Sequence, residues 1–123
     1  MDKKRILVVD DEVEIVRAVE IRLKQADYET LSAYDGMEGL KKARKEKPDL
    51  IILDLMLPKM DGYKVCALLK KDTKYSAIPV ILFSARAQES DKQLGEEVGA
   101  DAYITKPFEQ QALLGKIKEL LKE

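Results

Sequence analysis

Three carboxylates, a hydroxyl and an ammonium directly follow short apolar segments of this sequence: Asp10 and Asp11, Asp54, Ser84, and Lys106. Carboxylates brought together repel one another, and a divalent cation relieves that repulsion. Oxygen ligands without histidine or cysteine select Mg²⁺, Mn²⁺ or Ca²⁺, and Mg²⁺ commonly keeps coordination positions for phosphate oxygens. Ser84 could donate a hydrogen bond to such a phosphoryl group, Lys106 could neutralise its charge, and one carboxylate could act as a nucleophile that forms an aspartyl phosphate.

Asp54 stands out in this set because it lies inside the apolar run Ile51–Pro58. An ionised carboxylate taken out of water is costly unless it is paired, hydrogen-bonded or bound to a metal. Ordinary structural roles are available for the others: the acidic stretch 10–12 could cap a helix, the serine could stand in a turn, and the lysine could be a solvated surface charge. Their joint occurrence after apolar segments favours one shared site.

The composition excludes several classes of chemistry. The chain has 123 residues, of which 46% are hydrophobic, which fits one domain spanning 1–123 with a single core. It contains no histidine, so a Ser-His-Asp triad, a histidine-ligated zinc site and a phosphohistidine carrier are excluded. Cys66 is the only cysteine, which excludes an intrachain disulfide and a cysteine zinc cluster, and we expect it to be a packing residue.

Charge and hydropathy indicate where the chain works. The net charge is −1, with 22 basic residues spread among 23 acidic ones, so no basic stripe is available for nucleic acid. The apolar run near the N-terminus is far too short for a signal peptide or a membrane span. We therefore expect a cytoplasmic protein that binds neither nucleic acid nor membranes by itself.

Alternating strand and helix patterns must position the candidate site. Apolar, β-branched segments predict strands over Arg5–Val9, Leu50–Leu53, Pro79–Phe83 and Ala102–Thr105, and a more polar strand over Tyr28–Tyr34. Helical spacing marks five apolar stripes: Val13, Val16, Val19 and Leu23; Met37, Leu40 and Ala43; Val65, Leu68 and Leu69; Leu94 and Val98; and Leu113, Ile117, Leu120 and Leu121. Asp35–Glu38 matches a capping box, and Pro48 and Gly99 are expected to follow helix ends.

Five strands alternating with five helices predict an α/β fold with a doubly wound parallel sheet and helices on both faces. The polar second strand is expected at an edge of the sheet. In such sheets ligands bind beyond the carboxyl ends of the strands, which is where the candidate side chains would meet.

The chain resembles the receiver domains of two-component response regulators. The motifs that carry the resemblance are Val8–Glu12 (VVDDE), Leu53–Gly62 (LDLMLPKMDG), Phe83–Ala85 (FSA) and Tyr103–Phe108 (YITKPF). The similarity extends from Lys4 to Leu121. It implies the chemotaxis-regulator-like strand order 2-1-3-4-5, which is a flavodoxin-like arrangement.

The resemblance also assigns roles at the site. It implies that Asp54 is the phosphoacceptor and that Asp11 and Asp54 bind Mg²⁺ directly, with Mn²⁺ as an alternative metal. Asp10 would hold the ion more indirectly, and the backbone carbonyl of Met56 would be a further ligand. Lys106 would bind a phosphoryl oxygen.

The remaining implied roles concern the switch and the loops. Ser84 would bind a phosphoryl oxygen and Tyr103 would respond to it, so that the surface of the fourth helix, fifth strand and fifth helix changes its preferred partner. The bond between Lys106 and Pro107 would be cis. Asp61 would cap the third helix.

The partners implied are a sensor histidine kinase or a histidine phosphotransfer protein, and a downstream effector or output domain. The chain would be a signalling domain that catalyses its own phosphorylation and dephosphorylation rather than a metabolic enzyme. We expect a monomer, with dimerisation on phosphorylation left open. Family members that dimerise on DNA often carry two acids before the fifth-strand tyrosine, whereas here Asp101 is followed by Ala102.

Three competing functions share parts of this pattern. An aspartyl-phosphate hydrolase would need an acid or base two residues after the nucleophile, where this chain has Met56. A flavin carrier would need a phosphate-binding loop after the first strand, where the acidic stretch 10–12 would repel a phosphate. A degenerate receiver that only binds partners would lack site residues, and none of the expected ones is missing.

Overall fold

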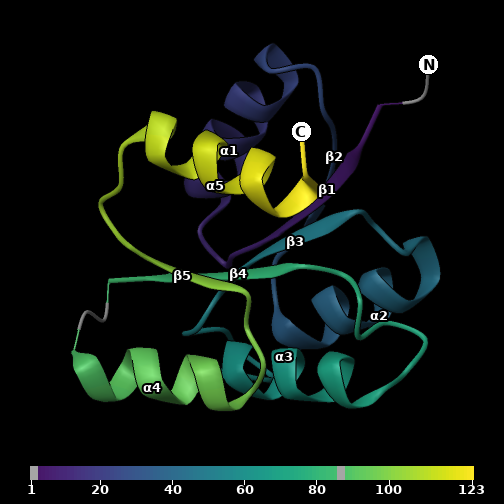
Figure 1. Ribbon diagram of the computed structural model, residues 1–123, viewed down its shortest axis with the longest axis vertical. Coiled ribbons are helices and arrows are strands. Elements are labelled where there is room, and N and C mark those ends of the chain that lie inside the picture. The colour runs from purple at the N-terminus through teal and green to yellow at the C-terminus, as the bar shows by residue number, and fades with distance from the viewer. Residues whose placement is uncertain (1–2, 86–87) are drawn as a thin grey trace.

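The computed structural model describes residues 3–85 and 88–123, and strands and helices alternate along the chain (Figure 1). The strands are β1 (Arg5–Val9), β2 (Glu29–Ala33), β3 (Leu50–Asp54), β4 (Val80–Ser84) and β5 (Ala102–Thr105). The helices are α1 (Val13–Gln25), α2 (Gly36–Glu46), α3 (Gly62–Lys71), α4 (Glu89–Glu97) and α5 (Gln110–Leu121).

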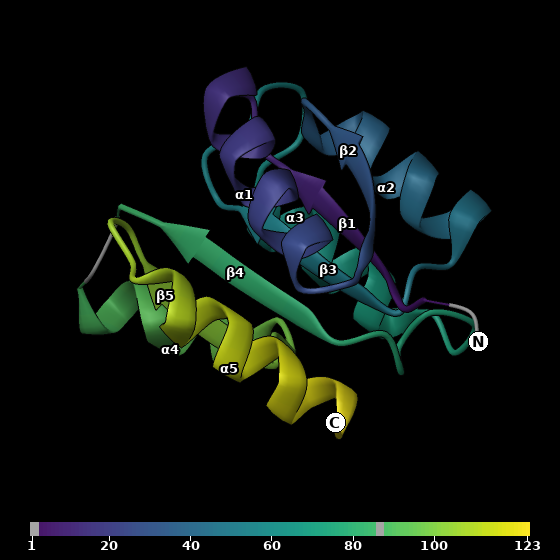
Figure 2. The ribbon, with the colours of Figure 1, turned by 90° about the horizontal axis from the view of Figure 1, so that it is seen from above.

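The five strands form one parallel sheet in the order β2-β1-β3-β4-β5 (Figure 2). This confirms the predicted doubly wound α/β fold and strand order. The three inner strands are buried almost throughout, whereas β2 and β5 are only partly buried, because each edge strand has a neighbour on one side only. The more polar second strand lies at an edge, as predicted.

Side chains alternate between two cores, one on each face of the sheet. α1 and α5 cover one face and α2, α3 and α4 cover the other (Figure 1). In β1, Ile6 and Val8 pack in the core under α1 and α5, while Leu7 and Val9 pack in the core under α2 and α3. This period of two explains why the strands read as continuous apolar runs: both faces of the sheet are covered.

Side-chain caps fix the starts of two helices near the candidate site. Asp35 accepts a hydrogen bond from the Glu38 N–H at 2.7 Å, and Asp61 accepts one from the Lys64 N–H at 3.0 Å. The predicted capping box is only half formed, because the Glu38 carboxylate bonds the N–H of Tyr34, one residue before the cap. Asp61 caps α3, as the resemblance implies.

Helix ends agree with the predicted stop signals, while one strand is shorter than predicted. Pro48 follows the end of α2, and Gly99 follows α4 with a φ of 90°, a backbone conformation that favours glycine. β2 contains neither Tyr28 nor Tyr34: Tyr28 is buried in the core under α1 and α5, and Tyr34 is exposed at the turn into α2.

Three residues predicted on apolar helix stripes are exposed instead: Val13, Met37 and Leu94. Successive residues of a helix are rotated by about 100°, and the buried face of each helix is centred on other positions. These three residues therefore lie at the border of the buried face. In α4, for example, the buried residues are Asp91 and Gly95. Among residues 3–85 and 88–123, no helix is long and apolar enough to span a membrane.

Candidate phosphoryl and metal site

Strand pairing brings the predicted side chains to one edge of the sheet. Asp54 and Ser84 are the last residues of β3 and β4, and Asp54 pairs in register with Phe83. The N–H of Lys106, just after β5, donates to the carbonyl of Ser84 at 2.8 Å. Asp10 directly follows β1, whose neighbour in the sheet is β3. Parallel strands therefore deliver all these residues at their carboxyl ends, as the sequence predicted.

Lys106 lies between two buried carboxylates. Its ammonium is 2.9 Å from Asp10 Oδ2 and 3.3 Å from Asp54 Oδ2. It also lies 4.5 Å from the centre of the Phe83 ring, a cation–π contact that stabilises its position. The peptide bond between Lys106 and Pro107 is cis. The lysine is thus a mostly buried cation that faces the nucleophile candidate, not a solvated surface charge.

Burial raises the pKa of the Asp54 carboxyl above its usual value of 3.8, and the nearby Asp10 carboxylate raises it further. Lys106 and the Met56 N–H oppose that increase. For Lys106, burial alone would lower the pKa, but hydrogen bonding and attraction to Asp10 and Asp54 outweigh it and raise the pKa of the ammonium. The lysine therefore remains charged, whereas the carboxylate is held in an unfavourable environment that a cation can relieve.

Carboxylate oxygens of Asp10, Asp11 and Glu12 all lie within 4.8 Å of one another. Asp10 is fully buried, and its Oδ1 accepts a hydrogen bond from the Glu12 N–H at 2.9 Å, while Asp11 and Glu12 are exposed. Glu12 is the residue before α1, yet its side chain makes no capping bond. Side-chain capping of α1 therefore does not explain Glu12.

The donor set at this edge fits a hard cation. It consists of oxygen atoms only, which suits Mg²⁺ or Mn²⁺. The Lys106 ammonium donates hydrogen bonds to both Asp10 and Asp54, so Asp54 lies next to the acidic group formed by Asp10, Asp11 and Glu12. Sequence reasoning did not assign Glu12 to the metal; the only signal for it was its place next to Asp10 and Asp11.

The loop after β3 is shaped by its backbone contacts with the nucleophile candidate. The N–H of Met56 lies 3.4 Å from Asp54 Oδ1, and Met56 is 63% exposed. The N–H of Gly62 donates to the carbonyl of Leu55 at 2.8 Å, so that α3 begins against this loop. A Cβ at Gly62 would lie only 2.2 Å from the carbonyl oxygen of Asp54, which explains why a glycine is needed there.

The two predicted switch residues come from neighbouring strands, β4 and β5. Ser84 is buried and Tyr103 is half-buried, and the hydroxyl of Tyr103 lies in an environment that Tyr63, Asp91 and Ser84 influence. Burial first, and then the proximity of Tyr63 and Asp91, raises the pKa of Tyr103 to about 12. Tyr103 is therefore partly buried rather than an exposed rim residue. The role of Tyr63 was missed in the sequence, because nothing in the spacing of residues 63 and 103 indicates contact.

Comparisons with known proteins agree with this arrangement. A model of the response regulator receiver domain matches residues 6–118. The alkaline phosphatase synthesis transcriptional regulatory protein PhoP of Bacillus subtilis is 46% identical over 119 residues, which cover 97% of this chain and 49% of that protein. Protein PilG of Pseudomonas aeruginosa is 39% identical over 117 residues, which cover 95% of this chain and 87% of PilG.

Solved structures show the same fold. A putative response regulator from Chloroflexus aurantiacus superposes with a TM-score of 0.94 at 34% identity, covering 99% of this chain and 100% of that one. The chemotaxis protein CheY4 of Vibrio cholerae has a TM-score of 0.90 at 32% identity, covering 97% of this chain and 99% of that one. The chain spans about half the length of PhoP and of several other transcriptional regulators that it matches.

Proposed function

Because this chain belongs to the response regulator receiver domain family, we propose that Asp54 accepts a phosphoryl group from a phosphohistidine of a partner sensor histidine kinase or histidine phosphotransfer protein. The observation that carries this proposal is the position of Lys106, whose ammonium contacts both Asp10 and Asp54 at the buried strand ends. The phosphohistidine must lie outside this chain, since this chain has no histidine.

The transfer is a displacement at phosphorus. A carboxylate oxygen of Asp54 forms the new P–O bond while the P–N bond to the partner's histidine breaks, and the electron pair of that bond remains on the histidine nitrogen. Lys106 neutralises charge on the phosphoryl oxygens, and Ser84 donates a hydrogen bond to one of them. Hydrolysis of the resulting acyl phosphate would return Asp54 to its starting state.

A divalent ion is part of the proposal. Bound Mg²⁺, or Mn²⁺, would neutralise the charge that the phosphoryl group brings to an already acidic edge. We assign Asp11 and Asp54 as direct ligands, Asp10 as an indirect one and the Met56 carbonyl as a further ligand, and we add Glu12 as a neighbouring carboxylate. This oxygen donor set matches what hard cations bind.

The consequence of phosphorylation that we propose is a change in partner binding at α4, β5 and α5. The downstream partner would be an effector protein or an output domain. PhoP is a transcriptional regulator, but an output domain of that kind remains a proposal for this chain. A cytoplasmic location and a monomeric state before phosphorylation are predictions from the sequence.

Mass spectrometry after incubation with acetyl phosphate and Mg²⁺ tests the proposal. We expect one added phosphoryl group on Asp54, no labelling of Asp54→Ala, and no labelling when EDTA is present. Asp27→Asn is the matched control, because Asp27 is an exposed aspartate that precedes β2, at the opposite edge of the sheet. Undiminished phosphorylation of Asp54→Ala at another residue would overturn the assignment.

A further inference from the structure

The loop between β3 and α3, residues 55–61, carries the Met56 carbonyl that we assign to the metal. At its base, Leu55 is buried and its carbonyl accepts the N–H of Gly62 at 2.8 Å. Met56 itself is held loosely, because it is 63% exposed and its N–H lies 3.4 Å from Asp54 Oδ1, which is a long hydrogen bond. The direction of the Met56 carbonyl therefore depends on what holds the loop beyond this residue.

The start of α2 holds the far side of this loop. α2 and α3 lie next to each other on the same face of the sheet (Figure 1). Gly36 is the first residue of α2, and the first N–H groups of a helix have no acceptor within that helix. Its N–H donates instead to the carbonyl of Pro58 at 3.2 Å. The loop thus supplies the acceptor that the helix lacks, and the helix fixes the loop.

The close approach of α2 to the loop requires a residue without a side chain. A Cβ at Gly36 would overlap the carbonyl oxygen of Met60 and would lie 2.7 Å from its carbonyl carbon and 2.8 Å from its Cβ. Two of these three atoms belong to the backbone, which cannot turn aside as the end of a side chain can. A larger residue at position 36 would therefore displace the loop itself.

The loop needs this external support because its tip is strained. The Met60 N–H donates to the Pro58 carbonyl at 2.8 Å and closes a three-residue turn centred on Lys59. Lys59 has a φ of 69°, a left-handed conformation that is uncommon for a residue with a side chain and typical of the strained form of such turns. Conformations of this kind persist only where neighbouring contacts determine them. Gly36 provides such a contact, because its N–H bonds the same Pro58 carbonyl.

An ion pair between the same two segments contributes less. Asp35 Oδ2 lies 3.7 Å from the ammonium of Lys59, whose side chain is mostly exposed. Pairs of this kind at the surface are weak, because water screens them and the long side chain loses freedom. The backbone contacts of Gly36 are therefore the main attachment between α2 and the loop.

From these contacts we propose that Gly36 is a positioning residue for the metal site. By holding Pro58 and Met60, it fixes the direction of the Met56 carbonyl, which lies two residues before Pro58. Mg²⁺ requires nearly ideal octahedral geometry, so a displaced carbonyl would bind it poorly. The start of α2 thus contributes to metal affinity without supplying a ligand. The inference rests on the proposed function, in which the Met56 carbonyl binds Mg²⁺.

Calorimetric titration with Mg²⁺ tests Gly36→Ala at a temperature at which every variant is folded. The added methyl group displaces the loop, so Mg²⁺ affinity should fall about tenfold, which is the usual effect of removing the support of a metal ligand. The Mg²⁺ concentration that half-saturates phosphorylation by acetyl phosphate should rise by the same factor. Loss of stability alone would not change either quantity in the folded protein.

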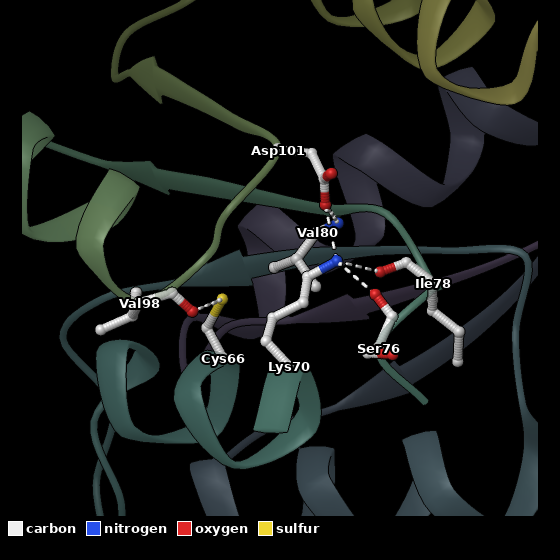
Figure 3. Close-up of polar contacts among 7 residues, drawn as sticks. All are labelled: Cys66, Lys70, Ser76, Ile78, Val80, Val98 and Asp101. Carbon is white, nitrogen blue, oxygen red and sulfur yellow. Dashed lines mark hydrogen bonds and ion pairs between the residues drawn. The ribbon is translucent and has the colours of Figure 1, made fainter. Parts of the chain in front are cut away.

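Gly99→Ala is the matched control for lost stability. Gly99 has a φ of 90°, which disfavours alanine, and a Cβ there would lie 3.1 Å from Lys70 Cγ. The ammonium of Lys70 bonds the carbonyls of Ser76 and Ile78, which precede β4 at the amino end of the sheet, away from Asp54 (Figure 3). This variant should lower the Tm and keep the Mg²⁺ affinity of the wild type.

Hydrogen exchange of the wild type gives a second test, which needs no variant. Coupling between two sites is reciprocal, so Mg²⁺ bound at the Met56 carbonyl should oppose local opening of the bond from the Gly36 N–H to Pro58. We expect exchange of the Gly36 amide to slow severalfold when Mg²⁺ is added. The Gly39 amide is the internal control: it bonds the carbonyl of Asp35 at 2.9 Å in the first turn of α2, and its exchange should change much less.

Each outcome decides the inference. Wild-type Mg²⁺ affinity in Gly36→Ala, an equal loss of affinity in Gly99→Ala, or exchange of the Gly36 amide that Mg²⁺ does not slow would overturn the positioning role. If Gly36→Ala does not fold, exchange of the wild type decides. If the wild type binds no Mg²⁺, the proposed metal site fails as well, whereas binding that depends on Asp11 but not on Gly36 refutes the positioning role alone.

Discussion

The ammonium of Lys106 lies 3.3 Å from the carboxylate of Asp54, and both groups are largely shielded from water. Despite this pairing, the pKa of the Asp54 carboxyl is raised, because burial and the charge of Asp10 outweigh the attraction to the lysine. The ionised form of Asp54 therefore destabilises the metal-free fold relative to the neutral form. The site has more negative charge than its own residues can neutralise, which is the condition under which a divalent ion binds well.

We predict that Asp54→Asn stabilises the metal-free protein at neutral pH. The amide keeps the shape of the side chain and removes the buried charge, so the free energy of unfolding should rise. For a domain of this size each 1 kcal/mol corresponds to roughly 4 °C in Tm. Thermal unfolding in EDTA measures the change, and a Tm below that of the wild type would contradict the prediction.

The pH dependence of this effect has a definite sign. Because the folded-state pKa of Asp54 is raised above the unfolded value of 3.8, the neutral carboxyl favours the fold below that value, and this contribution is lost as the pH rises through the folded-state pKa. The advantage of Asp54→Asn should therefore be absent in acid and grow as the pH increases. Adding Mg²⁺ should reverse the order, because only the carboxylate can bind the ion as a charged ligand.

We predict different effects for the two exposed acids beside Asp10. Asp11→Asn removes a proposed direct ligand and should weaken Mg²⁺ binding by about tenfold or more, which corresponds to about 1.4 kcal/mol. Glu12→Gln removes only a neighbouring charge and should have a smaller effect. Isothermal titration calorimetry at constant ionic strength measures both. Equal losses in the two variants would show that net charge, rather than coordination, determines affinity.

We predict opposite stability changes for two glycines in helices. Gly62→Ala would place a Cβ 2.2 Å from the carbonyl oxygen of Asp54, so the start of α3 must shift, and the free energy of unfolding should fall by about 1–3 kcal/mol. Gly115→Ala on α5 meets nothing within 4 Å and should raise it by about 0.5–1 kcal/mol. Urea unfolding measures both changes.

The same pair of variants separates stability from function. Displacement of the Asp54 backbone in Gly62→Ala should slow phosphorylation by acetyl phosphate, while Gly115→Ala should react at the wild-type rate. If Gly62→Ala reacted normally, the backbone contact with Asp54 would be structural only.

We predict that Cys66 is inert in the native protein. Its side chain is completely buried, with its sulfur 3.7 Å from the carbonyl of Val98 (Figure 3), and burial raises the pKa of its thiol to about 11. Iodoacetamide at about pH 8 should leave the folded protein unmodified and should react after denaturation, because the thiolate is the nucleophile. Rapid alkylation under native conditions would show that this region opens.

The thiol should also make stability depend on alkaline pH. Its pKa is about 11 in the fold against 9.0 in the unfolded chain, so the unfolded state ionises first and stability falls as the pH rises from 9 to 11. Tyr28 and Tyr103, with pKa values of about 12, add a similar decrease at higher pH. Unfolding of Cys66→Ala isolates the contribution of the thiol, because that variant should lose less stability between pH 9 and 11.

Local patterns in the sequence determined the fold class and the membership of the site. Alternation of apolar strands with helical stripes requires parallel strands, and parallel strands place their carboxyl ends at one edge. Once that is so, Asp10, Asp54, Ser84 and Lys106 must lie at the same edge, because each stands just at or beyond a strand end. The strand order that brings them together came from the resemblance to the receiver family.

The tertiary structure decided which atoms pair within that site and how α4 is attached to α3. Contact of Lys106 with Asp10 at 2.9 Å, and the hydrogen bond from the Tyr63 hydroxyl to the carbonyl of Asp91, join residues far apart in the chain. Such contacts follow no fixed spacing in the sequence, because the distance between the two side chains depends on how the helices pack against the sheet. The contacts of Lys70 with Asp101 and with the carbonyls of Ser76 and Ile78 were not predicted, for the same reason: the sequence shows only a lysine near a helix end, which is usually solvated.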